Sequence, residues 1–171
     1  DFWKITFEPV KASTIATERE RLNKLVAPAR AAISELEACQ RDARMNGELL
    51  DFFLFGARRL ELYAQRELDR LDAVVAYRDA TQARSERPEL LGKAEAALRR
   101  SRDAHEALSK RFAELWAREN KPYALDWTLN RYRQAVAKYD DVLKRQANVR
   151  AAASEGRPMA SGKEVGLEMV E

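Results

Sequence analysis

The stretch from Leu91 to Leu115, LGKAEAALRRSRDAHEALSKRFAEL, carries the clearest structural signal in the chain. Steps of three and four residues alternate through its stripe: Leu91, Ala94, Leu98, Ser101, His105, Leu108, Phe112 and Leu115. This spacing keeps one side of an α-helix in contact with a neighbour, as in the seam of a coiled coil. The stretch therefore predicts a long amphipathic helix, ending near Asn120-Lys121-Pro122.

The segment before it predicts two more helices. The first begins near Ser13 or Thr14, both good N-caps, and ends at Asn46-Gly47, which tolerate the left-handed conformation. We expect Pro28 to kink or locally open this helix, because proline lacks the backbone N–H. The expected buried stripe comprises Ile15, Leu22, Leu25, Ala29, Ile33 and Leu36.

The second helix is predicted from about Glu48 to Gln82. Its first turns, Leu49 to Phe55, are apolar on nearly every side, so we expect this end to be the most buried. We attribute Gly56 to a close approach of two helices, with ligand access as the alternative. The expected stripe comprises Phe53, Ala57, Leu60, Ala64, Leu68, Leu71 and Val75.

Two polar breaks separate the later elements. Arg84-Ser85-Glu86-Arg87-Pro88 is predicted to separate the second helix from the third, with Pro88 in the first turn of the latter. A fourth helix is predicted to begin between Pro122 and Asp126 and to run to about Ala153. Its stripe comprises Leu125, Leu129, Tyr132, Val136, Tyr139 and Leu143.

These patterns predict an all-α protein, an elongated antiparallel bundle of about four long helices. Helices of this length span about 45 Å, and short connections favour an up-down-up-down arrangement. A bent bundle, or a three-helix bundle with an outlying helix, are the alternatives. Only 6 glycines and 5 prolines occur in 171 residues, which disfavours a β-protein with many tight turns.

The ends of the chain differ from the middle. Residues 1–12 are predicted as an extended segment or a linker from a preceding domain, residues 13–154 as the bundle, and residues 155–171 as a tail. Four large apolar residues, Phe2, Trp3, Ile5 and Phe7, need a surface to pack against. Since the chain begins at Asp1 without methionine, we expect a processed protein or an excised piece.

The charge pattern limits the partners. The 31 basic and 28 acidic residues are interspersed, whereas a nucleic-acid-binding protein usually concentrates positive charge on one face. No apolar run approaches the roughly 20 residues of a membrane span. We therefore expect neither a nucleic-acid nor a membrane partner.

The chain has few residues suited to catalysis or to metal binding. A di-iron bundle needs two Glu-x-x-His motifs, but this chain has a single histidine, His105, preceded three positions earlier by Arg102. We predict that His105 is a neutral core residue and that Cys39 is a small buried one. Asp140 and Asp141 are expected at the surface, and no cofactor is predicted.

The junction between the third and fourth helices is rich in aromatic and polar residues. Such residues are enriched at protein interfaces and at surfaces that contact sugars. The alternative is that they only cap the end of the core. The candidate contact residues for a neighbouring domain or a sugar are Trp116, Arg118, Glu119, Asn120, Tyr123, Trp127 and Arg131.

The same junction, Phe112 to Asp126 followed by Asn130-Arg131-Tyr132, resembles the helical region after the catalytic barrel in some bacterial family 20 glycoside hydrolases. The run Phe55 to Leu62 is also similar to that region, and Asp1-Phe2-Trp3 would be the join. These enzymes are β-N-acetylhexosaminidases, in which an adjacent Asp-Glu pair on the barrel assists attack by the substrate's 2-acetamido group. Because this chain contains no Asp-Glu dipeptide, no catalytic residue is carried over.

The resemblance implies a non-catalytic helical domain of a larger carbohydrate-active enzyme. Its partner would be the catalytic domain of the same polypeptide, with carbohydrate as a second candidate, and it would be periplasmic or secreted. An independent helical module that binds another protein is the alternative, because helical packing alone does not report function.

Overall fold

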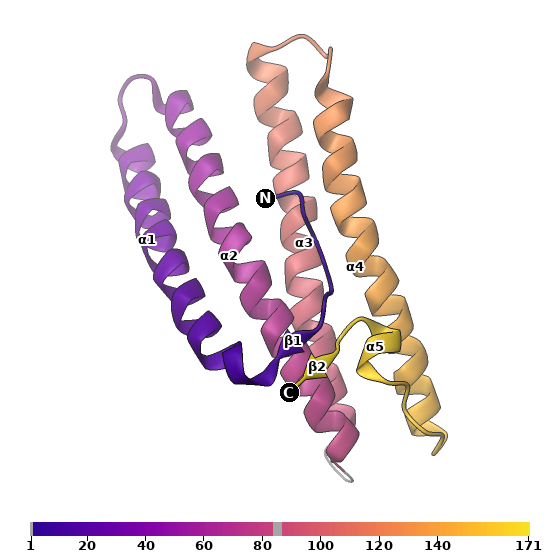
Figure 1. Cartoon of the computed structure of the whole chain (residues 1–171). Helices are drawn as coiled ribbons and strands as arrows, with labels where there is room; N and C mark the ends of the chain where they lie inside the picture. The colour runs from indigo at the N-terminus through magenta and orange to yellow at the C-terminus, as the bar shows by residue number, and fades with distance from the viewer. Residues whose placement is uncertain (1, 84–86) are drawn as a thin grey trace.

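The computed structural model describes residues 2–83 and 87–171, and four long helices account for most of them (Figure 1). They are α1 (Ile15–Asp42), α2 (Gly47–Gln82), α3 (Arg87–Glu119) and α4 (Leu125–Ser154). The remaining elements are short: β1 (Val10–Lys11), the 3-10 turn η1 (Ala12–Thr14), α5 (Gly162–Val165) and β2 (Met169–Val170). The predicted all-α bundle of about four antiparallel helices is confirmed.

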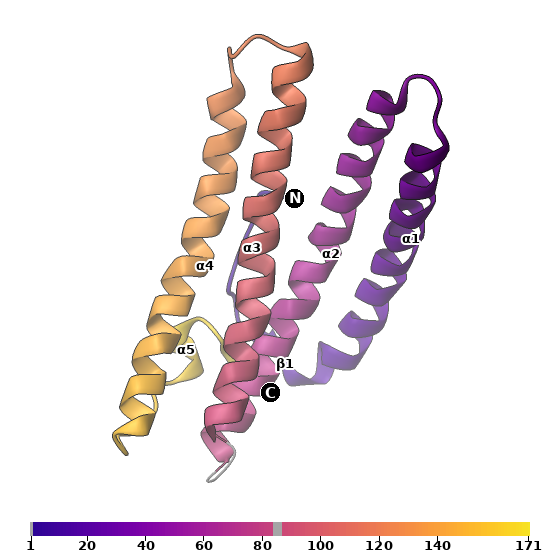
Figure 2. The same cartoon turned by 180° about the vertical axis from the view of Figure 1, so that it is seen from behind.

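The bundle is open rather than closed into a ring. Helix α2 packs against α1 on one side and α3 on the other, and α3 packs against α4. Helices α1 and α4 therefore form the two edges of the array, as Figures 1 and 2 show. This arrangement leaves α1 with most of its packing on a single neighbour.

The helix limits lie close to those predicted, except that α1 ends earlier than expected. Helix α1 ends at Asp42, and Asn46 adopts the left-handed conformation immediately before α2. Helix α1 is continuous through Pro28, which lies on its exposed side. Of the predicted polar break, residues 84–86 lie outside the described part, whereas Pro88 occupies the first turn of α3 as expected.

The stripe of α3 is buried as predicted, but three predictions for α1 and α2 are wrong. In α1, Leu25 is exposed and Val26 takes its place in the core, because the helix turns that side toward α2. The first turns of α2 are not the most buried part of that helix, since Leu49 and Phe53 are exposed there, and Leu60 further along the predicted stripe is exposed too. Gly56 has no heavy atom within 4 Å of the place where a Cβ would lie, so no helix approaches it closely.

The N-terminal segment, which we call the strap (residues 2–12), runs along the bundle in front of α3 (Figure 1). Its Ile5 and Val10 side chains are buried in the core. Three basic side chains bind its backbone: Arg66 donates to the carbonyls of Phe2 and Lys4, Arg70 to Glu8, and Lys138 to Ile5. The strap thus fills space on the open side of the helical array.

The C-terminal tail folds back onto the strap. Strands β1 and β2 pair in parallel, with Val10 opposite Met169 and Lys11 opposite Val170. Ser161 and Glu164 form a capping box that starts α5, and Val165 and Leu167 are buried. Gly162 allows the chain to close on itself, since a Cβ there would lie 2.6 Å from the Leu167 carbonyl oxygen.

Candidate functional site

The seven junction residues predicted as one site point in different directions. Trp116 is half-buried, its indole N–H donates to the Lys121 carbonyl (2.9 Å), and its ring lies 5.6 Å from that of Phe112. Glu119 and Asn120 end α3 in solvent, and the Asn120 N–H donates to the Trp116 carbonyl. These three residues lie in the last turn of α3 and at the start of the connection to α4.

Arg118 turns away from the other junction residues and toward α2. It pairs with Asp51, which also accepts from Arg111 (2.5 Å) and from Gln40 of α1 (2.8 Å). The hydrogen bond from Arg118 is the main reason that the pKa of Asp51 is lowered below its ordinary value. We call Asp51, Gln40, Arg111 and Arg118 the clasp, because they join α1, α2 and α3 at the end near the helix connections.

Tyr123 and Trp127 form an exposed aromatic pair beside the junction. Their side chains are 81% and 73% exposed, and their ring centres are 6.5 Å apart. Trp127 precedes Arg131 by four residues, which places both on the same side of α4. Because the Arg131 guanidinium lies 5.7 Å from the Trp3 ring, this side faces the strap.

Helix α2 exposes a second apolar stripe beside the strap, which sequence reasoning missed. Leu49, Phe53, Leu60 and Tyr63 follow the spacing of one helix face, and Gly56 falls in the same row. Arg66 connects this stripe to the strap: its guanidinium lies over both the Tyr63 and Phe2 rings. The spacing carries this signal, but the predicted core stripe of this helix includes two of these residues, Phe53 and Leu60.

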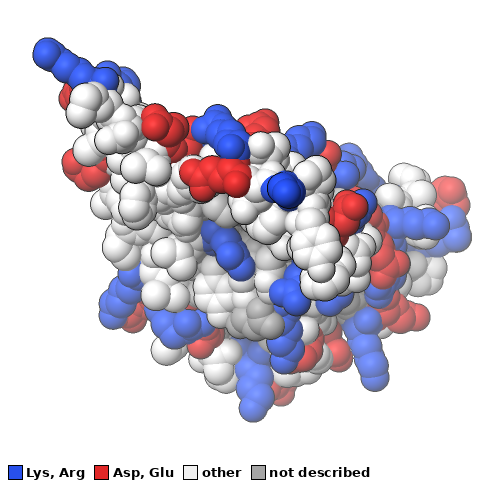
Figure 3. All heavy atoms as spheres, turned by 90° about the horizontal axis from the view of Figure 1, so that it is seen from above, with Lys and Arg blue, Asp and Glu red and all other residues white. Residues whose placement is uncertain are grey.

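We call these two exposed sets together the strap-side face. It consists of the α2 stripe and the aromatic pair of α4, which flank Phe2 and Trp3. In the part of the chain that the structure describes, Leu25 and Met45 are the other exposed large apolar residues. Figure 3 shows the molecule from the end that holds the α1–α2 and α3–α4 connections. On this end, areas of surface without charged side chains lie between individual Lys, Arg, Asp and Glu side chains. Large exposed apolar sets of this kind mark interaction surfaces.

Serine, histidine and aspartate also meet in the core, but not as a catalytic triad. The Ser101 hydroxyl donates to the Asp69 carboxylate (2.8 Å) and not to the His105 ring, so the serine and histidine side chains do not form a nucleophile–base pair. Nδ1 of His105 lies 2.7 Å from the Ser101 carbonyl oxygen, which can only accept; Nδ1 must therefore carry the proton. Nε2 is buried, and no described group hydrogen-bonds to it.

His105 is the neutral core residue that was predicted. Its side chain is fully buried, and burial lowers its pKa from 6.5 to about 4. The rings of Phe2 and Tyr139 lie 5.8 and 5.5 Å from it. The prediction for Cys39 is wrong: the thiol-bearing residue is exposed, because α1 turns this position away from α2.

The two adjacent aspartates of α4 lie at the surface in ion pairs. Asp140 pairs with Arg102 and Asp141 with Arg145, at the surface as expected. Among the described residues, no group of three or more His, Cys, Asp or Glu side chains could hold a metal ion. No described helix has the length and apolar character to span a membrane.

Comparison with known proteins does not place the chain in a family. No protein-family model, curated protein or solved structure matches it.

Proposed function

We propose that the chain is a non-catalytic helical domain that docks, through its strap-side face, onto the catalytic domain of a larger carbohydrate-active enzyme. The observation that carries the docking is the exposure of Phe53 and Leu60 on α2 and of Trp127 on α4. Aromatic anchors of this size contribute much of the binding energy at interfaces. The carbohydrate-active partner, a β-N-acetylhexosaminidase, is supported by the resemblance at the α3–α4 junction.

Gly56 fits this role better than a role in the fold. It lies in the row of the α2 stripe at a half-buried position, where an added Cβ would have none of the neighbouring heavy atoms of the described chain within 4 Å. Glycine inside a helix costs about 1 kcal/mol relative to alanine. A partner backbone that approaches the stripe closely would account for a glycine at this position.

The arginines beside the strap strengthen the face as a docking platform. Arg59 lies 4.5 Å from the Phe2 ring centre and 5.2 Å from that of Trp3. With Arg131 on the opposite side, the two aromatic rings are fixed by cations from α2 and α4. Phe2 and Trp3, which lie between the two parts of the face, are therefore held in place before any partner binds, and this lowers the entropic cost of association.

The proposal is tested by photo-crosslinking in the source cells. A photoreactive amino acid replaces Trp127 in the native polypeptide, and the same amino acid replaces the exposed Ala147 of α4 as the matched control. We expect Trp127 crosslinks to a catalytic domain of the same polypeptide, and a purified polypeptide that hydrolyses N-acetylhexosaminides. No crosslink above the Ala147 control would overturn the docking.

Two other results would test the domain assignment and the hexosaminidase assignment separately. Crosslinks from Trp127 to a separate polypeptide would overturn the domain assignment and establish the alternative, an independent interaction module. Crosslinks within one polypeptide that lacks activity on N-acetylhexosaminides would keep the docking and overturn the hexosaminidase assignment. A band on a denaturing gel several times heavier than 19.6 kDa is expected for the parent enzyme.

A further inference from the structure

A pocket lies between the strap and α1, over the middle of α2 (Figure 1). It has a volume of about 460 Å³, which is within the usual range of small-molecule sites. Lys4 and Thr6 of the strap, Arg21 of α1 and Tyr63 of α2 line it from three sides. The pocket is therefore built from segments that only the fold brings together.

The lining of this pocket is positively charged. Five basic side chains line it against two carboxylates, which leaves a net charge of three positive. Counting the exposed Glu8 of the strap as a third carboxylate would still leave two positive charges. The excess is local, since the 31 basic and 28 acidic residues of the whole chain are nearly balanced. The basic lining residues are Lys4, Lys11, Arg21, Arg66 and Arg70, and the acidic ones are Glu18 and Glu67.

The two lining carboxylates balance only part of this charge. Glu18 pairs with Arg21 (2.8 Å), and Glu67 pairs with Arg70 (3.1 Å). Glu67 also lies 3.4 Å from the Arg66 guanidinium, so one carboxylate serves two guanidinium groups. The Arg21 side chain is 57% exposed and uses Nε and one terminal nitrogen for Glu18. Since a guanidinium has five N–H donors, Arg21 keeps donors for a ligand.

The excess charge comes from two lysines and a buried arginine. Lys4 and Lys11 are exposed, and neither ammonium group has a carboxylate within 4 Å among the described residues. Arg66 is only 2% exposed, and it donates to the carbonyls of Phe2 and Lys4, which carry no formal charge. Because a buried charge is screened less than a surface charge, Arg66 strengthens the attraction of this pocket for an anion.

We propose that this pocket binds a small phosphate monoester. Such a group carries a charge of about −1.5 to −2 at pH 7 and three acceptor oxygens, so it offsets more of the positive excess than a carboxylate or a sulfate ester. Lys4 and Lys11 of the strap and Arg21 of α1 donate to these oxygens. The pocket is larger than a phosphate ion needs, and the hydroxyl groups of Thr6 and Tyr63 contact a polar organic part.

The test uses the whole chain and isothermal titration calorimetry with four probes: glucose 6-phosphate, glucose 6-sulfate, glucose and inorganic phosphate. Glucose 6-phosphate is expected to bind at least about tenfold more tightly than glucose and several-fold more tightly than glucose 6-sulfate, with an affinity that falls as salt is added. Inorganic phosphate is expected to bind more weakly than the ester, because it fills less of the pocket. No binding of glucose 6-phosphate, or equal binding of the sulfate or of inorganic phosphate, would overturn the proposal.

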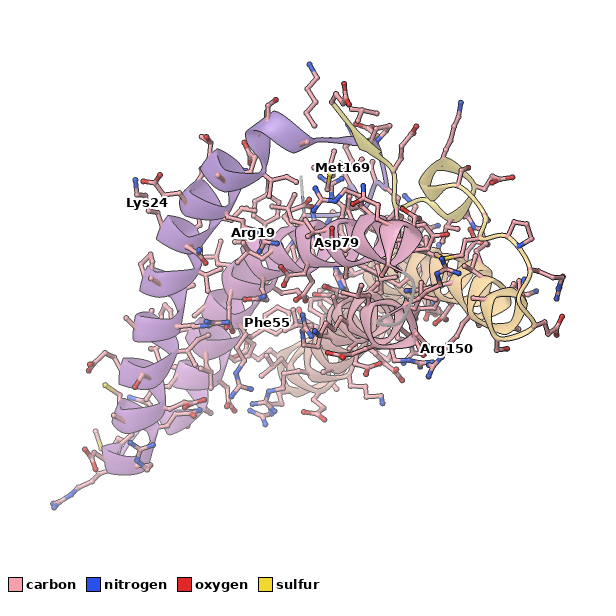
Figure 4. All side chains as sticks on the ribbon, turned by 90° about the horizontal axis from the view of Figure 1, so that it is seen from below. Arg19, Lys24, Phe55, Asp79, Arg150 and Met169 are labelled. Atoms are coloured by element: carbon pink, nitrogen blue, oxygen red, sulfur yellow. The ribbon has the colours of Figure 1, made fainter. Side chains whose placement is uncertain are left out.

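Two lysine variants locate the site, with a third lysine as the matched control. Lys4→Ala and Lys11→Ala each remove one positive charge from an exposed lining position, so the fold is retained. Lys24→Ala removes the same charge from α1 at a position outside the lining, where the side chain points away from the bundle (Figure 4). We expect each lining variant to weaken glucose 6-phosphate binding about five- to tenfold, and Lys24→Ala to change it less than about twofold. Equal weakening by all three would overturn the proposal.

Hydrogen exchange provides a second, independent test of the location. Because the strap forms one wall of the pocket, bound glucose 6-phosphate should slow the exchange of backbone amides in residues 4–14 and leave those of α4 unchanged. Protection confined to other parts of the chain would overturn the proposal. The pocket shares Tyr63 with the strap-side face, but Trp127 lies outside its lining. Trp127→Ala should therefore leave glucose 6-phosphate binding unchanged, so failure here is distinguishable from failure of the strap-side docking.

Discussion

The two halves of α2 have similar apolar content and opposite environments. From Ala64 to Ala80 the helix lies between α1, α3, the strap and the tail, and most of its side chains are buried. From Gly47 to Tyr63 only Leu54, Ala57 and Leu62 are buried, whereas Phe53 and Leu60 are exposed. Apolar residues in a helix therefore do not by themselves define a core; the neighbouring elements decide which of them are covered.

The difference follows from what packs around each half. Near the second half, the strap and tail add Ile5, Val10, Val165 and Leu167 to the core. Near the first half, the smaller cluster has only three fully buried members, Leu62, Leu108 and Tyr132. There Phe55 approaches α3, with its ring 5.9 Å from that of Phe112 (Figure 4). The first half thus has fewer buried neighbours and leaves large apolar side chains exposed.

The largest effect expected from this comparison comes from truncating the same residue type in each half. Leu71→Ala removes a buried side chain of the second half and should lower the free energy of unfolding by about 3 kcal/mol. Leu60→Ala, at a 67% exposed position, should change it by less than about 0.5 kcal/mol. Urea denaturation measures both, and equal losses would remove the distinction between the halves.

The pH dependence of stability probes the core around the second half. Because His105 has its pKa lowered to about 4, the unfolded chain binds a proton between pH 6.5 and about 4 that the folded chain does not. The free energy of unfolding should therefore fall in that window as the pH falls, by up to about 3 kcal/mol. Above pH 6.5 this contribution to stability is fully present.

The variant His105→Leu tests whether His105 causes this pH dependence of the free energy of unfolding. It should show no such fall between pH 6.5 and 4, while its stability at neutral pH stays equal to or above that of the unchanged chain. The reason is that Nε2 has no hydrogen bond to lose within the described residues, and that the Ser101 carbonyl, which accepts from Nδ1, lies inside α3 and keeps its helical hydrogen bond. A large loss of stability at neutral pH would instead show that His105 makes an essential buried hydrogen bond.

The clasp is expected to have a smaller, local effect in the first half. Asp51→Asn removes the charge that Arg111 and Arg118 share, and should cost about 1 kcal/mol. Hydrogen exchange should become faster in residues 43–60 and change little in residues 64–82. Asp126→Asn, which breaks an ion pair with an 89% exposed carboxylate, is the control expected to have no such effect.

The smallest effect concerns the two helical glycines with open space around them. Gly56→Ala and Gly92→Ala should each raise the free energy of unfolding by about 0.5–1 kcal/mol, because alanine favours the helix and neither Cβ would meet another atom within 4 Å. Thermal unfolding measures the gain. Only Gly56→Ala should reduce the Trp127 crosslinks of the parent polypeptide; an equal reduction by Gly92→Ala would separate Gly56 from the docking face.

Burial was predicted best where other helices cover the apolar stripe of a helix on both sides. In α3, seven of the eight predicted positions are buried and Phe112 is half-buried, because this helix has α2 on one side and α4 on the other. It was least successful at Leu25, Cys39 and Phe53, on parts of α1 and α2 that few elements cover. The same limit applies to the junction, where Trp116 and Arg118 bond within the chain while Trp127 faces solvent.

By itself, the sequence determined the helices, their order and most of their limits, since these follow from local periodicity and from breaks such as Asn120-Lys121-Pro122. Only the tertiary structure decided that the array is open, that the strap and tail cover its lower half, and that Asp69, Ser101 and His105 meet in the core. The physical reason is the different separation along the sequence of the residues that interact. Helix formation is governed by residues three or four apart, whereas burial depends on segments as distant as Val10 and Met169.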